Sequence, residues 1–547
     1  MKFLRNLSNL ERRVLFWGTV AALALTIIPY LFGFLAAGRD YVYLWVNPLG
    51  SADTNVYFSF IRQVADGNIF LQNLHTGEPQ TGSIFHPLWL VLGWISGLFR
   101  LSPAFVFHVS RLLLGATLLV LLYGFLTMVF SDPRRRMIAF LLAAFSSGIG
   151  LFFSLGVSQE NSTEILLLLP TDQWVSESNT FLTLLHSPLF LLSQILLLSI
   201  FWIFLQPRRA RQLWLAAATI FLLALIHPYD LVTVATVLPI FLVARWYIDP
   251  AFTGKDFWIS LRSLVVGGLA AAVPIAALLV AARIEPAIGG WAQQNVTRSP
   301  PLHSYLIGYG AVLLFAIPGI LVFRRRLTAP RLLVLVWLLV GAALLYAPFQ
   351  MNRRMTNGLH LALVILAAAG IELCWRAAAG RLPKRGFLRD SVIALFAWVL
   401  GFFLFFGTPA TVVKAIYWSR IPSASIYHVS RPVADAMDWL REQSPSDAVI
   451  LAHSYHGNIL PARADRRVYI GHGHQTINWQ DKRRLAAWFF RTNREDDAKH
   501  RFLLERGITH LFFSPLENAM GEYDPATKGY LVPVYTNHEV TIYRVLP

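Results

Sequence analysis

Residues 47–99 read NPLGSADTNVYFSFIRQVADGNIFLQNLHTGEPQTGSIFHPLWLVLGWISGLF and follow the first long apolar run of the chain. Asp53 and Tyr57 are four residues apart, so both lie on one face of the helix that the pattern predicts over 54–65. Asp53 stands at the start of that helix, where a carboxylate commonly accepts a hydrogen bond from a backbone N–H group. Two roles for Asp53 therefore stay open, a helix cap and a reactive carboxylate.

Apolar runs dominate the chain on both sides of this stretch. Of its 547 residues, 56% are hydrophobic and only 14% are charged, whereas a soluble chain carries about 25% charged residues. A helix crosses the bilayer core with ~20 mainly apolar residues, because its backbone polar groups must be bonded within the segment. We predict a polytopic α-helical membrane protein with about eleven spans, at 14–37, 103–130, 137–157, 183–205, 211–226, 231–248, 261–283, 303–323, 330–347, 358–376 and 389–409.

Basic residues gather in short loops between the apolar runs. Lys and Arg number 47 against 30 Asp and Glu, a net charge of +17. Membrane topology explains this excess, because cytoplasmic loops are enriched in Lys and Arg, and no nucleic-acid partner is expected. With the N-terminus inside, the clusters that fall on the cytoplasmic side are Arg134–Arg136, Arg208–Arg211, Arg245 with Lys255, Arg324–Arg326 and Arg381–Arg389.

The short apolar run His86–Phe99 is assigned to an interfacial or re-entrant helix, because counting it as a span would invert this charge pattern. An odd number of spans then places the C-terminus outside. We predict a membrane domain over 1–411, whose long first outer loop is 38–102, and a soluble α/β domain over 412–547 on the extracytoplasmic side. The expected location is the plasma (inner) membrane.

Polar residues collect on the outer face in this topology. Ionisable groups at the membrane boundary tend to be functional, which makes these residues the first candidates for a site. They are Asp53, His75, Glu78, His86, Glu160, Glu164, Asp172, Glu177, His186, His227, Asp230, Arg353, Arg354 and His360.

The layout of residues 47–99 resembles the GT-C superfamily. It has an acidic residue soon after the first span, an aromatic residue four positions later, a helix that ends at Gly, and a helix started by Pro in HPLWLVLGWISGLF. GT-C proteins are glycosyltransferases that take sugars from polyprenyl phosphate or diphosphate carriers on the outer side of the membrane. The resemblance implies that Asp53 is the catalytic base or orients the acceptor, and Tyr57 and His86 are expected substrate contacts.

Two arginines lie in the stretch PFQMNRRMTNGLH, residues 348–360. An inverting glycosyl transfer needs a carboxylate that accepts the proton of the attacking hydroxyl and cations that hold the leaving phosphate. Guanidinium groups pair with phosphate through two hydrogen bonds, so we predict that Arg353 and Arg354 bind the carrier. Two alternatives stay open: the arginines bind lipid headgroups non-specifically, or they pair with Glu177.

The second outer loop offers further acids and a histidine before the next span. Glu177 is predicted as a second catalytic carboxylate and His186 as a substrate contact, and a capping role stays open for both. In the turn IHPYD, residues 226–230, Pro228 breaks the helix, so His227 and Asp230 are predicted either to cap the broken helix ends or to contact substrate in the cavity.

No GxxxxGK[ST], GxGxxG or CxxC pattern occurs in the chain. The sequence therefore favours a lipid-linked sugar donor over a nucleotide, and it does not decide whether a divalent metal takes part. The single cysteine, Cys374, excludes an intrachain disulfide. The expected partners are membrane lipid, the polyprenyl-linked sugar donor, and a glycan, lipid or protein acceptor.

The C-terminal residues have a soluble α/β pattern, with strands predicted at 448–454, 466–471, 508–514 and 539–546 and helices at 432–443 and 481–506. Four histidines in this region, His453, His456, His472 and His474, raise a metal hypothesis. No cysteine or nearby carboxylate completes a ligand set in the sequence, so no metal site is predicted. Contact with the acceptor, or a lid over the membrane cavity, is the alternative role.

The favoured function is transfer of a sugar from a polyprenyl-phosphate or diphosphate carrier to an acceptor on the outer face, with Asp53 as base. A transporter or flippase of a lipid-linked or sugar substrate is the first rival. It would place functional charges midway along spans and show an internal repeat, and the sequence shows neither clearly. The second rival is a non-catalytic scaffold with the same fold.

Overall fold

The computed structural model describes residues 2–48, 50–154, 168–206, 210–380 and 386–547. Glu160 and Glu164, two of the candidate outer-face acids, lie outside the described residues. The chain divides into two compact units, each assembled from three segments. The helical unit comprises Met1–Pro29, Val109–Ile275 and Thr297–Tyr417, and the mixed unit comprises Tyr30–His108, Ala276–Val296 and Trp418–Pro547.

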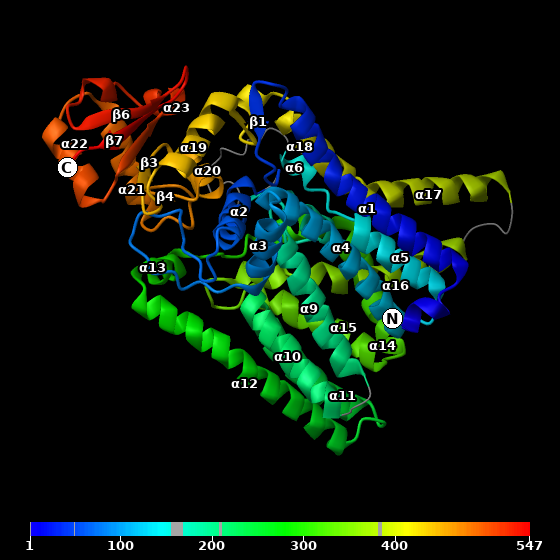
Figure 1. Ribbon diagram of the computed structural model, residues 1–547. Coiled ribbons are helices and arrows are strands. Elements are labelled where there is room, and N and C mark those ends of the chain that lie inside the picture. Colours follow the sequence, from blue (N-terminus) through cyan, green and yellow to red (C-terminus); the bar gives the residue numbers. More distant parts are fainter. Residues whose placement is uncertain (1, 49, 155–167, 207–209, 381–385) are drawn as a thin grey trace. The chain divides into compact units, whose positions relative to one another are not determined.

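Helices dominate the chain up to Ser419 (Figure 1). In chain order they are α1 (Asn9–Ala36), α2 (Ser51–Ala65), α3 (Pro87–Phe99), α4 (Pro103–Val129), α5 (Pro133–Phe145), α6 (Leu151–Ser154), α8 (Thr180–His186), α9 (Pro188–Leu205), α10 (Ala210–Ile226), α11 (Asp230–Ile248), α12 (Gly254–Ile284), α13 (Pro286–Gln294), α14 (Leu302–Arg325), α15 (Ala329–Leu344), α16 (Leu359–Ala379), α17 (Phe387–Phe405) and α18 (Gly407–Ser419). Short 3-10 turns include η1 (Lys2–Asn6), η2 (Thr171–Gln173), η3 (Asn352–Thr356) and η4 (Pro422–Ala424).

Seven of the described helical segments are long and apolar enough to cross a bilayer. They are α1, α4, α9, α11, α12, α14 and Asn352–Ala379, which contains η3 and α16. An eighth results if α17 and α18, bent by 46° relative to each other, count as one span. The predicted spans 211–226 and 330–347 correspond to the shorter apolar helices α10 and α15. The prediction of a multi-pass helical membrane protein is confirmed.

Two of the predicted apolar segments form helices that are too short to cross the bilayer by themselves. The run assigned to an interfacial helix forms α3, which has only 13 residues and, at 1.5 Å per residue, is far shorter than the bilayer core. The predicted span 137–157 is interrupted, because α5 ends at Phe145 and the next described helix, α6, covers only four residues. Between them Gly148 packs against α14 so closely that a Cβ would lie 2.3 Å from the carbonyl oxygen of Gly308.

The helical unit is held together by close helix contacts. Helices α14 and α16 pack backbone against backbone: a Cβ on Gly319 would lie 2.0 Å from the carbonyl oxygen of Leu366, and a Cβ on Gly370 would lie 1.9 Å from that of Phe315. Small residues at helix contacts are how membrane helices gain packing contacts, since lipid supplies no hydrophobic drive between them. Either glycine replaced by a larger residue would push the two helices apart.

The mixed unit contains a five-stranded sheet of order β4-β3-β5-β7-β6. Strand β3 is parallel to β4 and β5, and β7 is antiparallel to β5 and β6. The elements that form the sheet and its flanks are β3 (Val449–Leu451), β4 (Arg467–Val468), β5 (His510–Phe513), β6 (Leu531–Thr536), β7 (Thr541–Val545), α19 (Arg431–Gln443), α20 (Ser454–Ala464), α21 (Trp479–Arg491), α22 (Asp496–Glu505), α23 (Pro515–Asn518) and η5 (Pro525–Thr527).

Helices cover both faces of this sheet (Figure 1). The alternation of side chains along β3 explains the arrangement, since successive residues of a strand point to opposite faces. Ile450 packs with residues of α19 and α20, whereas Val449 and Leu451 pack with residues of α21 and α22. The predicted C-terminal α/β architecture is confirmed, and it has three layers.

The first outer loop is built into the mixed unit. Strand β1 (Tyr41–Tyr43) pairs antiparallel with β2 (His428–Ser430), and the N–H of Val468 donates to the carbonyl of Leu74 at 3.0 Å. The loop 38–102 thus belongs to the same compact unit as residues 418–547. The predicted domain limits, 1–411 and 412–547, stay a prediction.

Two details of the C-terminal prediction are wrong. The predicted helix 481–506 is two helices, α21 and α22, because the chain turns between them and Glu495 adopts a left-handed φ of 66°. Strand β6, which forms one edge of the sheet, was not predicted. Its Pro533 lacks a backbone N–H and interrupts the strand pattern, and an edge strand is where a sheet tolerates proline.

Candidate functional site

Asp53 lies in the first turn of α2, and its carboxylate bonds to a histidine from the far end of the chain. The residue in the N-cap position is Gly50, so the capping role left open for Asp53 is not the one that it has. Asp53 Oδ1 lies 3.0 Å from His472 Nε2. The Asp53 side chain is 51% exposed, while that of His472 is 4% exposed. A solvent-accessible carboxylate is thus oriented by a buried imidazole.

The backbone fixes which nitrogen of His472 carries the proton. The N–H groups of His474 and Gln475 both donate to Nδ1, at 3.0 and 3.1 Å. A ring nitrogen that accepts two hydrogen bonds carries no hydrogen, so the proton of the imidazole is on Nε2. His472 therefore donates its Nε2–H to Oδ1 of Asp53.

A second buried histidine, His75, packs against the ring of His472. His75, in the first outer loop, is 1% exposed, and its ring meets that of His472 edge to face with centroids 6.2 Å apart. Burial, and then the neighbouring His472, lowers the pKa of His75 to about 3. Its Nε2 lies 3.3 Å from the carbonyl oxygen of Asn458 and donates to it. His75 is thus uncharged near neutral pH and adds no positive charge beside Asp53.

A cavity of about 250 Å³ opens beside this pair, within the mixed unit. Asn55 and Asn458 are bonded to each other across it, Nδ2 to Oδ1, at 2.7 Å. Its lining residues are Ala52, Asn55, Ile426, Ser454, Tyr455, Asn458, Ile459, Gly471, His472, Gly473 and Trp479. The cavity therefore joins the helix that carries Asp53 to the segments that follow β3 and β4.

Tyr57 and His86, the predicted substrate contacts of the first loop, both stack on the ring of Trp89. Tyr57 stacks on Trp89 with centroids 4.8 Å apart, and His86 stacks on Trp89 at 5.3 Å. Trp89 is 2% exposed. Tyr57 thus joins α2 to α3, whereas His86, the N-cap residue of α3, packs on its own helix. Neither residue is among those that line the cavity.

In the helical unit, Glu177 and Arg354 form an ion pair, the alternative that the sequence left open. Arg354 Nη1 lies 2.5 Å from Glu177 Oε1, and the guanidinium of Arg353 lies 4.7 Å from the ring centroid of Trp174. Burial by itself would raise the pKa of Glu177, but Arg354 and Arg353 outweigh it and hold that pKa below its usual value. Glu177 is therefore ionised beside the two guanidinium groups of Arg353 and Arg354.

His227 and Asp230 also meet in the helical unit. Asp230 Oδ2 lies 3.0 Å from His227 Nδ1 and accepts hydrogen bonds from the hydroxyl of Ser193 and, at 2.7 Å, from Nδ2 of Asn357. Asp230 is not the N-cap of α11, which is Tyr229, a residue without a side-chain cap bond. A capping role for His227 at the end of α10 stays a prediction. Asp230 instead joins α11 to α9 and to Asn357, two residues before α16.

The remaining candidate of the second loop, His186, is the last residue of α8. Its ring stacks on Phe190 with centroids 5.5 Å apart, and the guanidinium of Arg354 lies 6.0 Å from that same ring. Tyr229 lies 5.8 Å from Arg354 and contacts the ring of His227. Glu177, His186, His227, Asp230, Arg353 and Arg354 thus belong to one contiguous cluster within the helical unit.

The four C-terminal histidines do not converge. Two of them have carboxylate partners: Glu517 lies 2.9 Å from His456, and Asp53 contacts His472. His453 caps α20 through Nδ1. Within the described ranges, no group of three His, Cys, Asp or Glu side chains is placed to hold a metal ion. These carboxylates are separated from the histidines by tens to hundreds of residues in sequence, so local spacing gave no sign of them.

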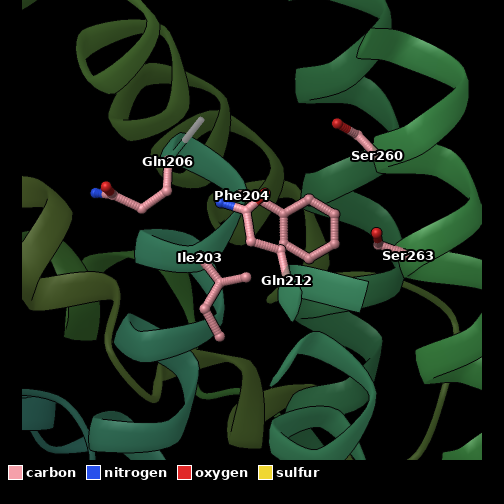
Figure 2. Close-up of a pocket in the computed structure, with 6 residues that line it drawn as sticks. All are labelled: Ile203, Phe204, Gln206, Gln212, Ser260 and Ser263. Carbon is pink, nitrogen blue, oxygen red and sulfur yellow. The ribbon is translucent and has the colours of Figure 1, made fainter. Parts of the chain in front are cut away.

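A second, much smaller cavity lies among α9, α10 and α12 of the helical unit. Figure 2 shows its lining, with Phe204 facing Ser260 and Ser263. Its volume is about 10 Å³, room for about one water molecule. A sugar or a phosphate does not fit in it.

Three solved membrane proteins share the fold of this chain at low sequence identity. The archaeal oligosaccharyltransferase AglB from Archaeoglobus fulgidus, in complex with an inhibitory peptide and a dolichol-phosphate, has a TM-score of 0.50 at 15% identity, covering 93% of this chain and 70% of that one. ArnT from Cupriavidus metallidurans in the apo state has a TM-score of 0.50 at 13% identity, covering 96% and 98%. The arabinofuranosyltransferase AftD from Mycobacteria has a TM-score of 0.52 at 15% identity, covering 99% of this chain and 40% of that one.

These similarities establish the GT-C fold, in agreement with the resemblance noted in the first loop. A search among curated proteins finds no match to the chain. Residues 188–544, well over half of the chain, match a family model described as "Family of unknown function (DUF6541)". The chain is a multi-pass membrane protein of GT-C fold, and it belongs to this family.

Proposed function

We propose that the chain transfers a sugar from a polyprenyl-phosphate or polyprenyl-diphosphate carrier to an acceptor on the outer face of the membrane. The observation that carries the proposal is the half-exposed carboxylate of Asp53, oriented by the Nε2–H of His472 beside a cavity that opens to solvent. AglB, which shares the fold, was solved with a dolichol-phosphate and a peptide, so a lipid phosphate is a ligand that this fold can accommodate.

Asp53 acts as the general base of an inverting transfer. The proton of an acceptor hydroxyl passes to its carboxylate, and the acceptor oxygen forms a bond to the anomeric carbon of the donor sugar. The bond from that carbon to the phosphate oxygen breaks, and its electron pair leaves on the phosphate. Attack on the face opposite the phosphate inverts the anomeric configuration.

Arg353 and Arg354 bind the carrier phosphate and stabilise the charge that it gains. The ion pair with Glu177 supports this role, because it holds the Arg354 guanidinium in one place before a ligand arrives. Glu177 was predicted as a second catalytic carboxylate, and its pairing favours the role of positioning Arg354. The same cluster contains His186, His227 and Asp230, whose side-chain contacts connect its helices.

The proposal includes the location of this chemistry. The first outer loop and the C-terminal residues lie outside the cytoplasm, at the plasma (inner) membrane, where polyprenyl-linked sugars are used after translocation. The basic loops predicted to be cytoplasmic support this orientation.

A reconstituted assay tests the proposal against both rivals. The purified chain is placed in proteoliposomes with a panel of polyprenyl-phosphate sugars and an extract of cell-envelope acceptors, and the lipids are followed by mass spectrometry. Transfer predicts the appearance of free polyprenyl phosphate together with a glycosylated acceptor. Movement of the intact lipid between leaflets, with its sugar retained, identifies a flippase, and the absence of both changes identifies a scaffold.

A further inference from the structure

The cavity beside Asp53 has the chemistry of a carbohydrate site. We infer that the acceptor is a glycan, and that the cavity of the mixed unit binds its terminal sugar with one hydroxyl directed at Asp53. This inference rests on the proposed function, which leaves open whether the acceptor is a glycan, a lipid or a protein. It assigns a substrate class to a cavity that Ala52 and Asn55 of the first loop line together with residues between 426 and 479.

The first argument is the charge of the lining. None of the eleven lining residues is Lys, Arg, Asp or Glu. The lining residue His472 bonds to the carboxylate of Asp53, which would repel a phosphate or an acidic peptide. The carrier phosphate therefore has no cation to bind in this cavity. An uncharged, hydrogen-bonding ligand fits it better.

The second argument is the mixture of amides and aromatic rings. A sugar offers many hydroxyl groups at its edge and C–H groups on its faces, so its sites combine amide side chains with flat rings. Asn55 and Asn458 supply the amides, each fixed by their mutual hydrogen bond. Tyr455 and Trp479 supply the rings. The hydroxyl of Tyr455 donates to the carbonyl of His428 at 2.9 Å, which holds that ring in place.

The third argument is the position of the cavity on the sheet. Ser454 and Tyr455 follow the carboxyl end of β3, and Gly471 to Gly473 follow that of β4. These strands are parallel, and ligands of open α/β sheets bind in the crevice outside the carboxyl ends of parallel strands. The volume, about 250 Å³, is enough for a sugar ring.

The fourth argument connects the cavity to the chemistry. His472 lines the cavity and also bonds to Asp53 at 3.0 Å. Ala52 and Asn55, on either side of Asp53 in α2, line it as well. A sugar in the cavity therefore lies next to the carboxylate that accepts a proton, and its hydroxyl is the group that loses one.

Glycan binding by the full chain in lipid nanodiscs tests the inference. A glycan array identifies the sugars bound, and saturation-transfer difference NMR measures their affinity for the wild type and for Trp479→Ala, Trp479→Phe and Trp488→Ala. Loss of one aromatic stacking contact corresponds to about a tenfold change in affinity. We expect Trp479→Ala to weaken glycan binding at least ~10-fold, and Trp479→Phe to keep most of it.

Trp488→Ala is the matched control. Trp488 lies on the same helix, α21, and packs against Phe502, but it does not line the cavity. It should bind glycans as the wild type does. Failure of the wild type to bind any sugar on the array, or equal binding by wild type and Trp479→Ala, would overturn the inference.

The outcomes separate this inference from the proposed function. Glycan binding that depends on Trp479, without any sugar transfer in the reconstituted assay, supports the cavity as a glycan site and contradicts the proposed function, and with it the role of that glycan as acceptor. Transfer to a peptide or lipid acceptor that is insensitive to Trp479→Ala supports the proposed function and contradicts the inference.

Discussion

Nε2 of His472 lies 3.0 Å from Oδ1 of Asp53, although 419 residues separate the two in the chain. The candidate site therefore needs both the loop after the first span, which carries Asp53, and the C-terminal residues, which carry His472. His472 is held by two backbone N–H groups, so its orientation depends on the turn at residues 472–475. The geometry of the proposed base is thus set by the C-terminal residues.

His472 is expected to act as a positioning residue. Replacing it by Ala removes the donor to Asp53 and leaves the N–H groups of residues 474 and 475 without their acceptor, so transfer should fall ~10- to 100-fold, as for other groups that orient a catalytic residue. The more conservative His472→Gln keeps a donor near the Nε2 position and should recover part of the rate. The kcat should fall more than the affinity for the donor. An unchanged kcat in His472→Ala would show that the contact has no role in the reaction.

The pairing of β1 with β2 predicts a disulfide. Tyr41 and Ser430 face each other as a non-hydrogen-bonded antiparallel pair, since the flanking bonds are Arg431 N–H to Asp40 and Leu44 N–H to Tyr427. The Cα atoms of such pairs lie about 4.5 Å apart, within reach of a disulfide. In a Cys374→Ser background, cysteines at 41 and 430 should form a disulfide in intact cells, because both positions are proposed to lie outside the cytoplasm.

The outcome separates sidedness from fold. A pair that stays reduced in cells but is oxidised in isolated membranes by copper phenanthroline would place both strands in the cytoplasm. A pair that never forms a disulfide, even with that oxidant, would contradict the strand pairing.

The ion pair in the helical unit predicts a large loss of stability from one substitution and a small loss from its neighbour. Arg354→Ala leaves Glu177, whose side chain is 6% exposed, charged and without its ion partner, which costs about 3–5 kcal/mol. Arg353→Ala removes a contact with the ring of Trp174 worth about 0.5–2 kcal/mol. Thermal unfolding should therefore show Arg354→Ala as the less stable variant, and Glu177→Gln in the same chain should restore part of the loss. Equal stability of the two arginine variants would contradict the importance of the pair.

Binding of the carrier is a separate readout of the same arginines. Arg353→Ala keeps the ion pair but removes one guanidinium, so it should bind polyprenyl phosphate more weakly with little change in unfolding temperature. Binding by Arg353→Ala equal to that of the wild type would remove Arg353 from the phosphate site.

His75 predicts a dependence of stability on pH. Its pKa is lowered from 6.5 to about 3 in the folded chain, so the unfolded chain binds a proton that the folded chain does not. The stability that this histidine contributes is complete above about pH 6.5 and is lost as the pH falls toward 3, by up to ~1.4 kcal/mol per pH unit. Unfolding temperatures between pH 7.5 and 5 should fall less steeply for His75→Gln than for the wild type. His538→Gln, on an exposed side chain, should keep the wild-type slope, and identical slopes in all three proteins would contradict the burial of His75.

The elements that local pattern determines were predicted from the sequence. The helix after Asp53 and the Pro-started α3 follow from hydrophobic spacing and from helix-start signals, as does α19. The break between α21 and α22 was not predicted, because both helices are rich in charged residues and only residues 492–495, with Glu495 left-handed, separate them.

The site was predicted only in its parts. Residue type and position pointed to Asp53, Glu177 and Arg354, and the pairing of the last two was one of the alternatives considered. The pairing of Asp53 with His472 was not, because a contact between residues this far apart depends on strand pairing and domain packing, which spacing does not encode. The same holds for the amide pair Asn55 and Asn458, which lie 403 residues apart.

The rate of sugar transfer by Asp53→Asn, measured in a single turnover at saturating lipid-linked sugar, tests the central claim most directly. Asn keeps the shape of the side chain and an oxygen for His472 but cannot accept the proton. The account predicts a rate at least ~100-fold below that of the wild type, the usual contribution of a general base, with unchanged binding of polyprenyl phosphate. Transfer by Asp53→Asn at the wild-type rate would contradict it.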